Sequence, residues 1–243
     1  MNHTHAAVEA TGLCRRYGRS WALIDVDLHV PAGTSLLVAG RNGSGKSTLF
    51  RVLAGALKPD RGSYRICGFD GIANRQEARA SIGLLGHHSN TWDALTALQN
   101  LQVVARFMGK KAGRRDLMPL LEEVGLAERA DSPITSFSAG MRKRIAFARL
   151  LLQEPKVVLL DEPYGQLDPP GFAFVDALVP RLTRNGSTVL MASHMLEKGA
   201  ELCDLGLALE RGRVIYRGPA SGLPAAFAAH HAPAQQRKLE AVR

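Results

Sequence analysis

Three short apolar runs, each bounded by turn residues, divide the chain into the pieces of an alternating α/β protein. They read TSLLVAG at residues 34–40, KVVLLDE at 156–162 and STVLMAS at 187–193. Runs of this length suit strands that are buried on both faces of a parallel sheet. Because each run leads into a loop or a helical pattern, we predict an α/β fold with a parallel sheet covered by helices.

Two other segments have the pattern of antiparallel strands. The stretch LGLALERGRVIYRG at 205–218 alternates around residues 210–212 and predicts a hairpin, and DVDLHVPAGTS at 25–35 predicts a strand and a turn. Between Asn90 and Leu152 the hydrophobic spacing becomes helical, as in LTALQNLQVVARFMG at 95–109. We therefore expect a helical subdomain at about 90–152, inserted into a domain formed by residues 1–219. Residues 220–243 are an Ala-rich basic tail that is either a short helix or disordered.

Composition narrows the function only slightly. The formal charge of +9 suits nucleotides, nucleic acid or an anionic membrane surface and does not choose among them. The three cysteines are widely spaced and form no CxxC, so a disulfide framework or a zinc site is not expected and a reducing compartment is favoured. No apolar run approaches the roughly 18 residues that span a bilayer, and the first residues hold no hydrophobic signal core. These features predict a soluble, cytoplasmic protein.

The first chemical motif is GRNGSGKST, between a predicted strand and a predicted helix. Glycines let such a loop curl so that successive N–H groups point at phosphate oxygens, and the helix N-terminus adds partial positive charge. Lys46 supplies a charge for the β- and γ-phosphates, and the Ser47 hydroxyl is placed to bind Mg²⁺. The residues expected to bind a nucleoside triphosphate are Gly40, Asn42, Gly43, Ser44, Gly45, Lys46, Ser47 and Thr48.

Hydrolytic groups follow the next two buried strands. Asp161 ends VVLLD and is expected to hold Mg²⁺, and Glu162 beside it is expected to orient or deprotonate the attacking water. His194 follows the third apolar run at the same predicted sheet edge, where ligands gather in open α/β folds. We expect it to bond the γ-phosphate or to hold the water and Glu162 in register.

A second loop, SFSAGMRKR at Ser136–Arg144, also has the small residues and following basic helix of an anion site. Taken in order, GRNGSGKST, SFSAGMRKRIAFARLLLQEPKVVLLDEPYGQLD and ASH resemble the ATP-binding subunit of ABC transporters over about residues 8–218. The resemblance implies a phosphate-loop NTPase core of the RecA-like type, with an antiparallel β part and the helical subdomain. It also implies ATP hydrolysis with Mg²⁺.

The resemblance explains why one chain carries two anion-binding devices. In that family the loop equivalent to Ser138, Ala139 and Gly140 closes over the γ-phosphate held by the facing subunit of a head-to-tail dimer. Asp168 resembles the residue of a loop that crosses the dimer interface, and Tyr17 resembles the aromatic residue that stacks on adenine. The implied partners are a second ATP-binding subunit, most simply another copy, and separate transmembrane permease subunits.

The chain departs from the family pattern in three places. Ala139 replaces a glycine and stays small, whereas Met141 replaces a glutamine and loses a hydrogen-bonding amide. In GLLGHHSNTW, His88 (or His87) takes the place of a glutamine that touches Mg²⁺ and the attacking water. A neutral imidazole can still hydrogen-bond, but a protonated one is unfavourable beside Mg²⁺. We therefore predict retained but pH-sensitive hydrolysis, which His88→Gln should alter between about pH 6 and 8.

The transported substrate follows less directly from these residues. The stretches LLGHHSNTWDALTALQNL and SFSAGM resemble the haem exporter of cytochrome c maturation, although drug, polysaccharide and lipid exporters share much of this text. Trp92, Asp93 and Leu95 are candidate contacts with the permease, which places the chain peripherally at the cytoplasmic face of the membrane. A soluble ATPase acting on nucleic acid or ribosomes is the other class considered, and only the basic stretch at 109–115 favours it. Nucleic acid is therefore not expected as a partner.

Overall fold

A six-stranded sheet forms the centre of the molecule in the computed structural model, which describes residues 6–86 and 91–231. Its order is β10-β9-β3-β8-β7-β6, and all neighbours are parallel except β9 and β10. The strands are β3 (Ser35–Ala39), β6 (Ile82–Leu85), β7 (Val157–Asp161), β8 (Thr188–Ala192), β9 (Leu205–Glu210) and β10 (Arg213–Pro219). The three apolar runs are β3, β7 and β8, and every residue of these strands is buried. The predicted parallel core and the late hairpin are both confirmed.

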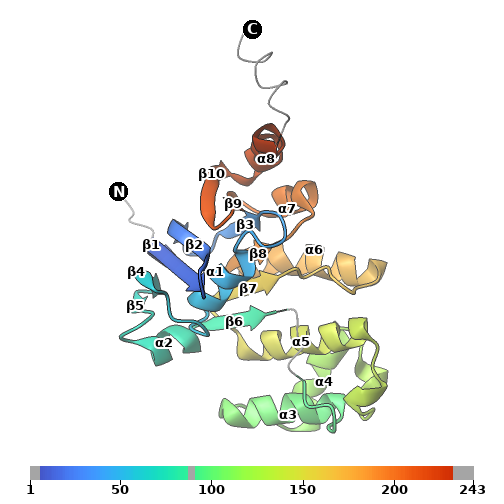
Figure 1. The fold of residues 1–243 in the computed structure, drawn as a ribbon. Helices are drawn as coiled ribbons and strands as arrows, with labels where there is room; N and C mark the ends of the chain where they lie inside the picture. The colour runs from blue at the N-terminus through green and yellow to red at the C-terminus, as the bar shows by residue number, and fades with distance from the viewer. Residues whose placement is uncertain (1–5, 87–90, 232–243) are drawn as a thin grey trace, which may run out of the picture.

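A four-stranded antiparallel sheet packs beside this core (Figure 1). Its strands, in the order β2-β1-β4-β5, are β1 (Ala6–Tyr17), β2 (Ser20–Pro31), β4 (Arg61–Ile66) and β5 (Phe69–Asp70). Helix α1 (Lys46–Leu53) follows β3, and its fully buried Leu49 and Phe50 share one hydrophobic cluster with Val8 of β1 and Leu159 of β7. This packing secures the start of α1, where the phosphate loop ends.

Some helices pack on the other face of the parallel sheet, and others form the helical subdomain that extends below it in Figure 1. They are α3 (Ala97–Phe107), α4 (Arg114–Glu123), α5 (Ala139–Gln153), α6 (Pro169–Arg184) and α7 (Leu196–Leu202), with short 3₁₀ turns at Ala127–Arg129 and Ile134–Ser136. A capping box between Thr96 and Gln99 begins α3. Leu101, Leu121 and Phe147 are fully buried where α3, α4 and α5 meet. The helical character predicted for about 90–152 is confirmed by α3, α4 and α5.

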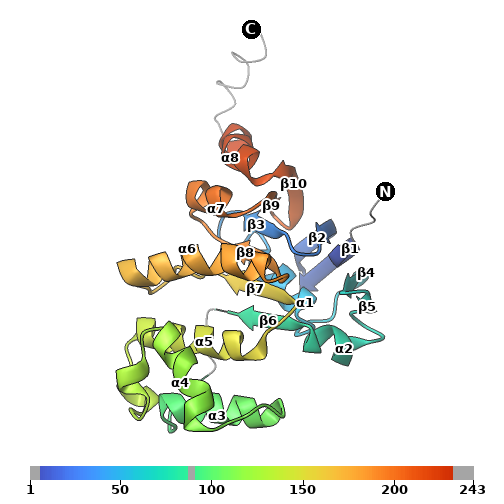
Figure 2. The ribbon, with the colours of Figure 1, turned by 180° about the vertical axis from the view of Figure 1, so that it is seen from behind.

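The remaining helices lie near the ends of the two sheets (Figure 2). Helix α2 (Arg75–Ala80) follows β5, and a 3₁₀ turn at Ala220–Gly222 leads into α8 (Leu223–His231). The first part of the predicted tail is thus helical, with Leu223 buried and Phe227 packed on the same core. No helix of the chain within 6–86 and 91–231 is both long and apolar enough to cross a bilayer.

Candidate functional site

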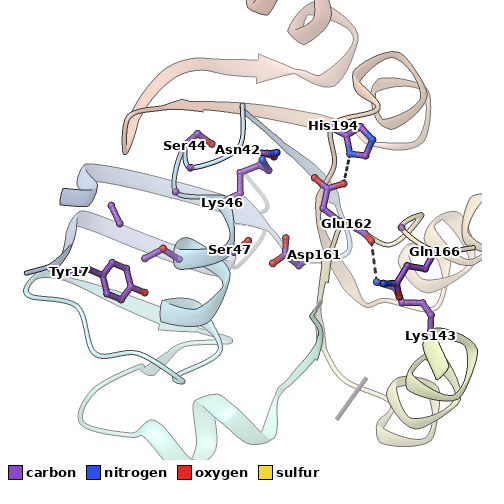
Figure 3. A pocket seen from close by; sticks show the side chains of 15 residues that line it. Tyr17, Asn42, Ser44, Lys46, Ser47, Lys143, Asp161, Glu162, Gln166 and His194 are labelled. Atoms are coloured by element: carbon purple, nitrogen blue, oxygen red, sulfur yellow. Dashed lines mark hydrogen bonds and ion pairs between the residues drawn. The ribbon is translucent and has the colours of Figure 1, made fainter. Parts of the chain in front are cut away.

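A cavity of about 740 Å³ opens at the edge of the parallel sheet where β3, β7 and β8 end. Figure 3 shows the side chains around it. The lining gathers the end of β1, the start of β2, the phosphate loop with the first turn of α1, the end of β7, the segments after β7 and β8, and one residue of α5. These residues are Tyr17, Ala22, Asn42, Gly43, Ser44, Gly45, Lys46, Ser47, Thr48, Lys143, Asp161, Glu162, Gly165, Gln166 and His194.

Two glycines allow the phosphate loop to curl tightly between β3 and α1. Gly40 has φ 151° and Gly45 has φ 112°, both in the region that disfavours side chains. A Cβ on Gly40 would lie 2.5 Å from the Leu209 carbonyl oxygen, and one on Gly45 would lie 2.4 Å from that of Ala22. Neighbouring backbone therefore requires glycine at both positions, and the loop is held close against β2 and β9.

Lys46 is the first residue of α1, directly after the loop, and is only 7% exposed. Its Nζ donates a hydrogen bond to the Gly40 carbonyl at 2.6 Å, which directs the ammonium back over the loop. Burial lowers the pKa of Lys46, and the charges of Glu162 and Asp161 oppose that shift. A poorly hydrated cation beside the N-terminus of a helix is suited to bind phosphate oxygens.

The two carboxylates at the end of β7 differ in environment. Asp161 is the last residue of the strand and is 5% exposed. Glu162 turns out of the strand with φ 51°, while its N–H still bonds to the Ala192 carbonyl at 2.9 Å. Its Oε2 lies 2.7 Å from Nδ1 of His194, as the dashed line in Figure 3 marks. The structure thus brings together Glu162 and His194, which are 32 positions apart in the chain.

The donor set suits a magnesium ion. Ser47 and Asp161 both line the cavity and offer a hydroxyl and a carboxylate, the hard oxygen ligands that Mg²⁺ prefers. Within the described ranges, no group of three or more His, Cys, Asp and Glu side chains could hold a metal by itself. Beside triphosphates, Mg²⁺ takes its other ligands from phosphates and water.

Tyr17, at the end of β1, lies at the far side of the cavity and is 46% exposed. The Arg15 guanidinium carbon lies 5.4 Å from its ring centroid. Because the Tyr17 side chain is exposed at the cavity, an adenine could stack on its ring.

The second predicted anion-binding turn, Ser138–Gly140, does not line this cavity. Ser138 caps α5, with its Oγ accepting from the Met141 N–H at 3.2 Å. None of Ser138, Ala139 and Gly140 is among the described residues that line the cavity. Asp168 caps α6 through the Gly171 N–H at 3.1 Å and pairs with Arg144 at 2.6 Å. The hydrogen bond from Arg144 is the main reason that the pKa of Asp168 is lowered.

The structure adds one charged group that the motifs did not identify. Lys143 on α5 lines the cavity, is 6% exposed and donates from Nζ to the Glu162 carbonyl at 3.1 Å. In sequence it is one of several basic residues in a helical run, and no local signal marks it as the one that turns inward. His87 and His88 lie outside the described residues, so the pH-sensitive role expected of His88 stays a prediction.

The comparison with known proteins decides the family. The family described as ABC transporter matches residues 23–165, more than half of the chain. The chain belongs to the ABC transporter family. Its membership makes this chain an ATP hydrolase, and ABC ATP-binding subunits use ATP with Mg²⁺, form dimers and work with transmembrane permeases.

Two relatives show the match over most of this ABC ATP-binding chain. The daunorubicin resistance ATP-binding protein DrrA3 of Streptomyces coeruleorubidus is 39% identical over 221 residues, which are 90% of this chain and 70% of the relative. The Nod factor export ATP-binding protein I of Paraburkholderia xenovorans is 33% identical and covers 90% of this chain and 72% of its own. The haem-exporter resemblance therefore finds no counterpart in these two names.

Solved structures agree with the ABC fold. An ATP-binding subunit of an ABC transporter has a TM-score of 0.82 at 25% identity, covering 98% of this chain and 100% of its own. The cbiO1 protein of Clostridium perfringens, part of the transporter complex cbiONQ, has a TM-score of 0.77 at 27% identity, with 97% and 99% covered. A dimeric ATP-binding cassette in a post-hydrolysis state with ADP and Pi has a TM-score of 0.78 at 25% identity, with 88% and 98% covered.

Proposed function

We propose that this chain is the ATP-hydrolysing subunit of an exporter and that two copies drive separate membrane-spanning permease subunits. The observation that carries the proposal is the division of the chemistry between two places. The phosphate loop, Asp161, Glu162 and His194 surround one cavity, whereas the Ser138–Gly140 turn lies outside it. A chain built this way holds a nucleotide but leaves one phosphate-binding turn available to a facing copy.

The cavity residues take the following roles in this proposal. The loop from Gly40 to Thr48 binds the phosphates, Tyr17 stacks on adenine, and Ser47 with Asp161 holds Mg²⁺. Glu162 accepts a proton from the attacking water, and His194 orients that carboxylate through the 2.7 Å contact. His88 stays a candidate for a further contact with the water.

The dimer completes each site in trans. Ser138, Ala139 and Gly140 of one copy close on the γ-phosphate of the other, where the capped start of α5 favours negative charge. Asp168 lies near that turn, because it pairs with Arg144 on α5, the helix that starts at the turn. Binding of two ATP molecules then closes the dimer, and hydrolysis reopens it.

We assign the permease contact to the helical subdomain. This subdomain belongs to a domain that spans residues 1–219, and the tail follows that domain. Trp92 is 41% exposed, and the Arg149 guanidinium carbon lies 5.0 Å from its ring centroid. Asp93 lies 4.0 Å from Arg142. An exposed aromatic ring beside charged groups is typical of an interface hot spot. This contact would hold the chain peripherally at the cytoplasmic face of the membrane.

For the substrate, the relatives' names support drug or Nod factor export ahead of haem export. The local resemblance of LLGHHSNTWDALTALQNL keeps haem as the second candidate. Action on nucleic acid is supported only by the basic stretch at 109–115 and has no counterpart in these names.

A purification of this chain from detergent-solubilised native membranes tests the proposal. We expect a multi-spanning partner to accompany the parent protein and to be lost with Trp92→Ala, whereas the exposed Trp21→Ala on β2 keeps it. A haem absorbance band in the eluate would support the second substrate candidate. Retention of ATPase activity with no membrane partner would contradict the exporter proposal.

A further inference from the structure

The first turns of α5 contact the segment that follows β7 at three points. We define this segment as Glu162–Asp168. A Cβ on Gly140 would lie 2.7 Å from the Gln166 carbonyl oxygen, so that helix and segment touch. Lys143 donates to the Glu162 carbonyl, and Arg144 pairs with Asp168. The turn that faces the partner's nucleotide and the carboxylate that faces the chain's own nucleotide are therefore joined within one chain.

Lys143 is the buried member of this contact. An ammonium group that is 6% exposed is costly unless it is hydrogen-bonded, and a methionine of similar length would fill the space without that cost. The ammonium group donates to the main-chain carbonyl of Glu162, 19 positions away. Burial lowers the pKa of Lys143, while the charges of Asp161 and Glu162 oppose the shift. The cation is thus placed between the carboxylates and the helix.

Glu162 has a backbone conformation that requires support. Its φ of 51° lies in the left-handed region, which is unfavourable for a residue with a side chain. Three hydrogen bonds hold it there: its N–H donates to Ala192, and its carbonyl accepts from Lys143 and from the Gly165 N–H at 3.2 Å. The turn sets the direction of the side chain toward His194. Losing a bond to the carbonyl would let the turn relax.

We propose that Lys143 is a positioning residue for ATP hydrolysis, which holds the Glu162 turn so that its carboxylate faces the attacking water. The inference rests on the role proposed above for Glu162. A displacement of α5 by the facing copy would be passed through Lys143 to the chain's own hydrolytic carboxylate. The link therefore couples the two nucleotide sites of the dimer.

The test compares Lys143→Met with two other variants in the full chain. Lys143→Gln keeps a hydrogen-bond donor. Lys110→Met is the matched control, because Lys110 donates to the Leu152 carbonyl at 2.8 Å near the other end of α5. For each protein, kcat and KM for ATP, the affinity for Mg-ADP and the melting temperature are measured.

We expect Lys143→Met to lower kcat by roughly 10- to 100-fold, the value of a hydrogen bond to a charged group. Its affinity for Mg-ADP should equal that of the parent, and Lys143→Gln should recover part of the rate. Lys110→Met should lower the melting temperature and keep the parent kcat. A parent-like kcat in Lys143→Met overturns the proposal, as does an equal loss of stability and rate in both methionine variants.

Combining the change with Glu162→Gln separates this inference from the proposed function. If both residues act through one carboxylate, Lys143→Met should add much less in that background than it does alone. A full multiplicative loss overturns the proposal. Parent-like activity of Glu162→Gln alone would refute the role of Glu162 itself. A fall for Glu162→Gln without any effect of Lys143→Met removes only the present inference.

Discussion

The two lysines that line the cavity are alike in chemistry and differ in origin. Lys46 and Lys143 are 7% and 6% exposed, each donates to a backbone carbonyl, and burial lowers the pKa of both against Asp161 and Glu162. Lys46 starts α1 within a contiguous motif, whereas Lys143 comes from α5 and meets a segment that follows another strand. In the proposed function, the α1 side of the cavity binds the nucleotide, and the α5 side positions the carboxylate that acts on it.

The largest expected effect falls on Glu162, which both sides face. Glu162→Gln removes the base while keeping its shape, so we expect ATP hydrolysis to fall roughly 10²- to 10⁴-fold. Mg-ATP should still bind and should trap a dimer, as seen by phosphate release and size-exclusion chromatography. Glu197→Gln, an exposed change on α7, serves as the control. A variant that binds ATP yet stays monomeric would count against closure by two nucleotides.

The next prediction distinguishes the two lysines by their effect on the affinity for Mg-ATP. Lys46→Met should weaken Mg-ATP binding by roughly 10- to 100-fold, because a charge-assisted hydrogen bond to phosphate is lost. Lys143→Met should leave that affinity unchanged. Titration calorimetry in the Glu162→Gln background measures both without turnover. Equal losses of affinity would remove the distinction between the α1 side and the α5 side.

A smaller effect tests the backbone of the α1 side. Gly45→Ala would put a Cβ 2.4 Å from the Ala22 carbonyl at a φ of 112°, so we expect about 1–3 kcal/mol of lost stability and weaker nucleotide binding. Gly43→Ala is the matched control, since it also has a positive φ but open space around the Cβ. Thermal denaturation should show the larger loss for Gly45→Ala. The reverse order would mean that close approach to β2 is not what demands glycine.

The smallest expected effect concerns Asp168 on the α5 side. Because Arg144 lowers the pKa of Asp168 in the folded chain, this pair stabilises the fold above the unfolded pKa of about 3.9. That contribution is lost as the pH falls through the folded value. Asp168→Asn keeps a good helix cap and removes the charge. The melting temperature of the parent minus that of the variant should be constant near neutral pH and shrink in acid; a difference independent of pH would contradict this assignment.

The fold was predictable where local pattern and tertiary structure agree. The runs that became β3, β7 and β8 are buried throughout, and the periodic segments became α3, α4 and α5. Strand β1 escaped notice because register shifts between Ala10 and Leu13, and again near Arg15, break the alternation that marks a strand. The pairing of β1 with β4, far along the chain, leaves no trace in either sequence alone.

The sequence by itself determined the nucleotide-binding loop, the carboxylates at the end of β7 and the basic helix that follows Ser138. Each is a contiguous motif whose chemistry depends on neighbours a few residues away. Only the tertiary structure decided that, of the two roles open to His194, its ring meets Glu162, and that Lys143 is the basic residue of α5 that turns inward. The Ser138 turn lies outside the chain's own cavity, a separation that the sequence suggested only through its resemblance to a family. These facts depend on how β7, β8 and α5 pack, because hydrophobic burial sets their positions without regard to distance along the chain.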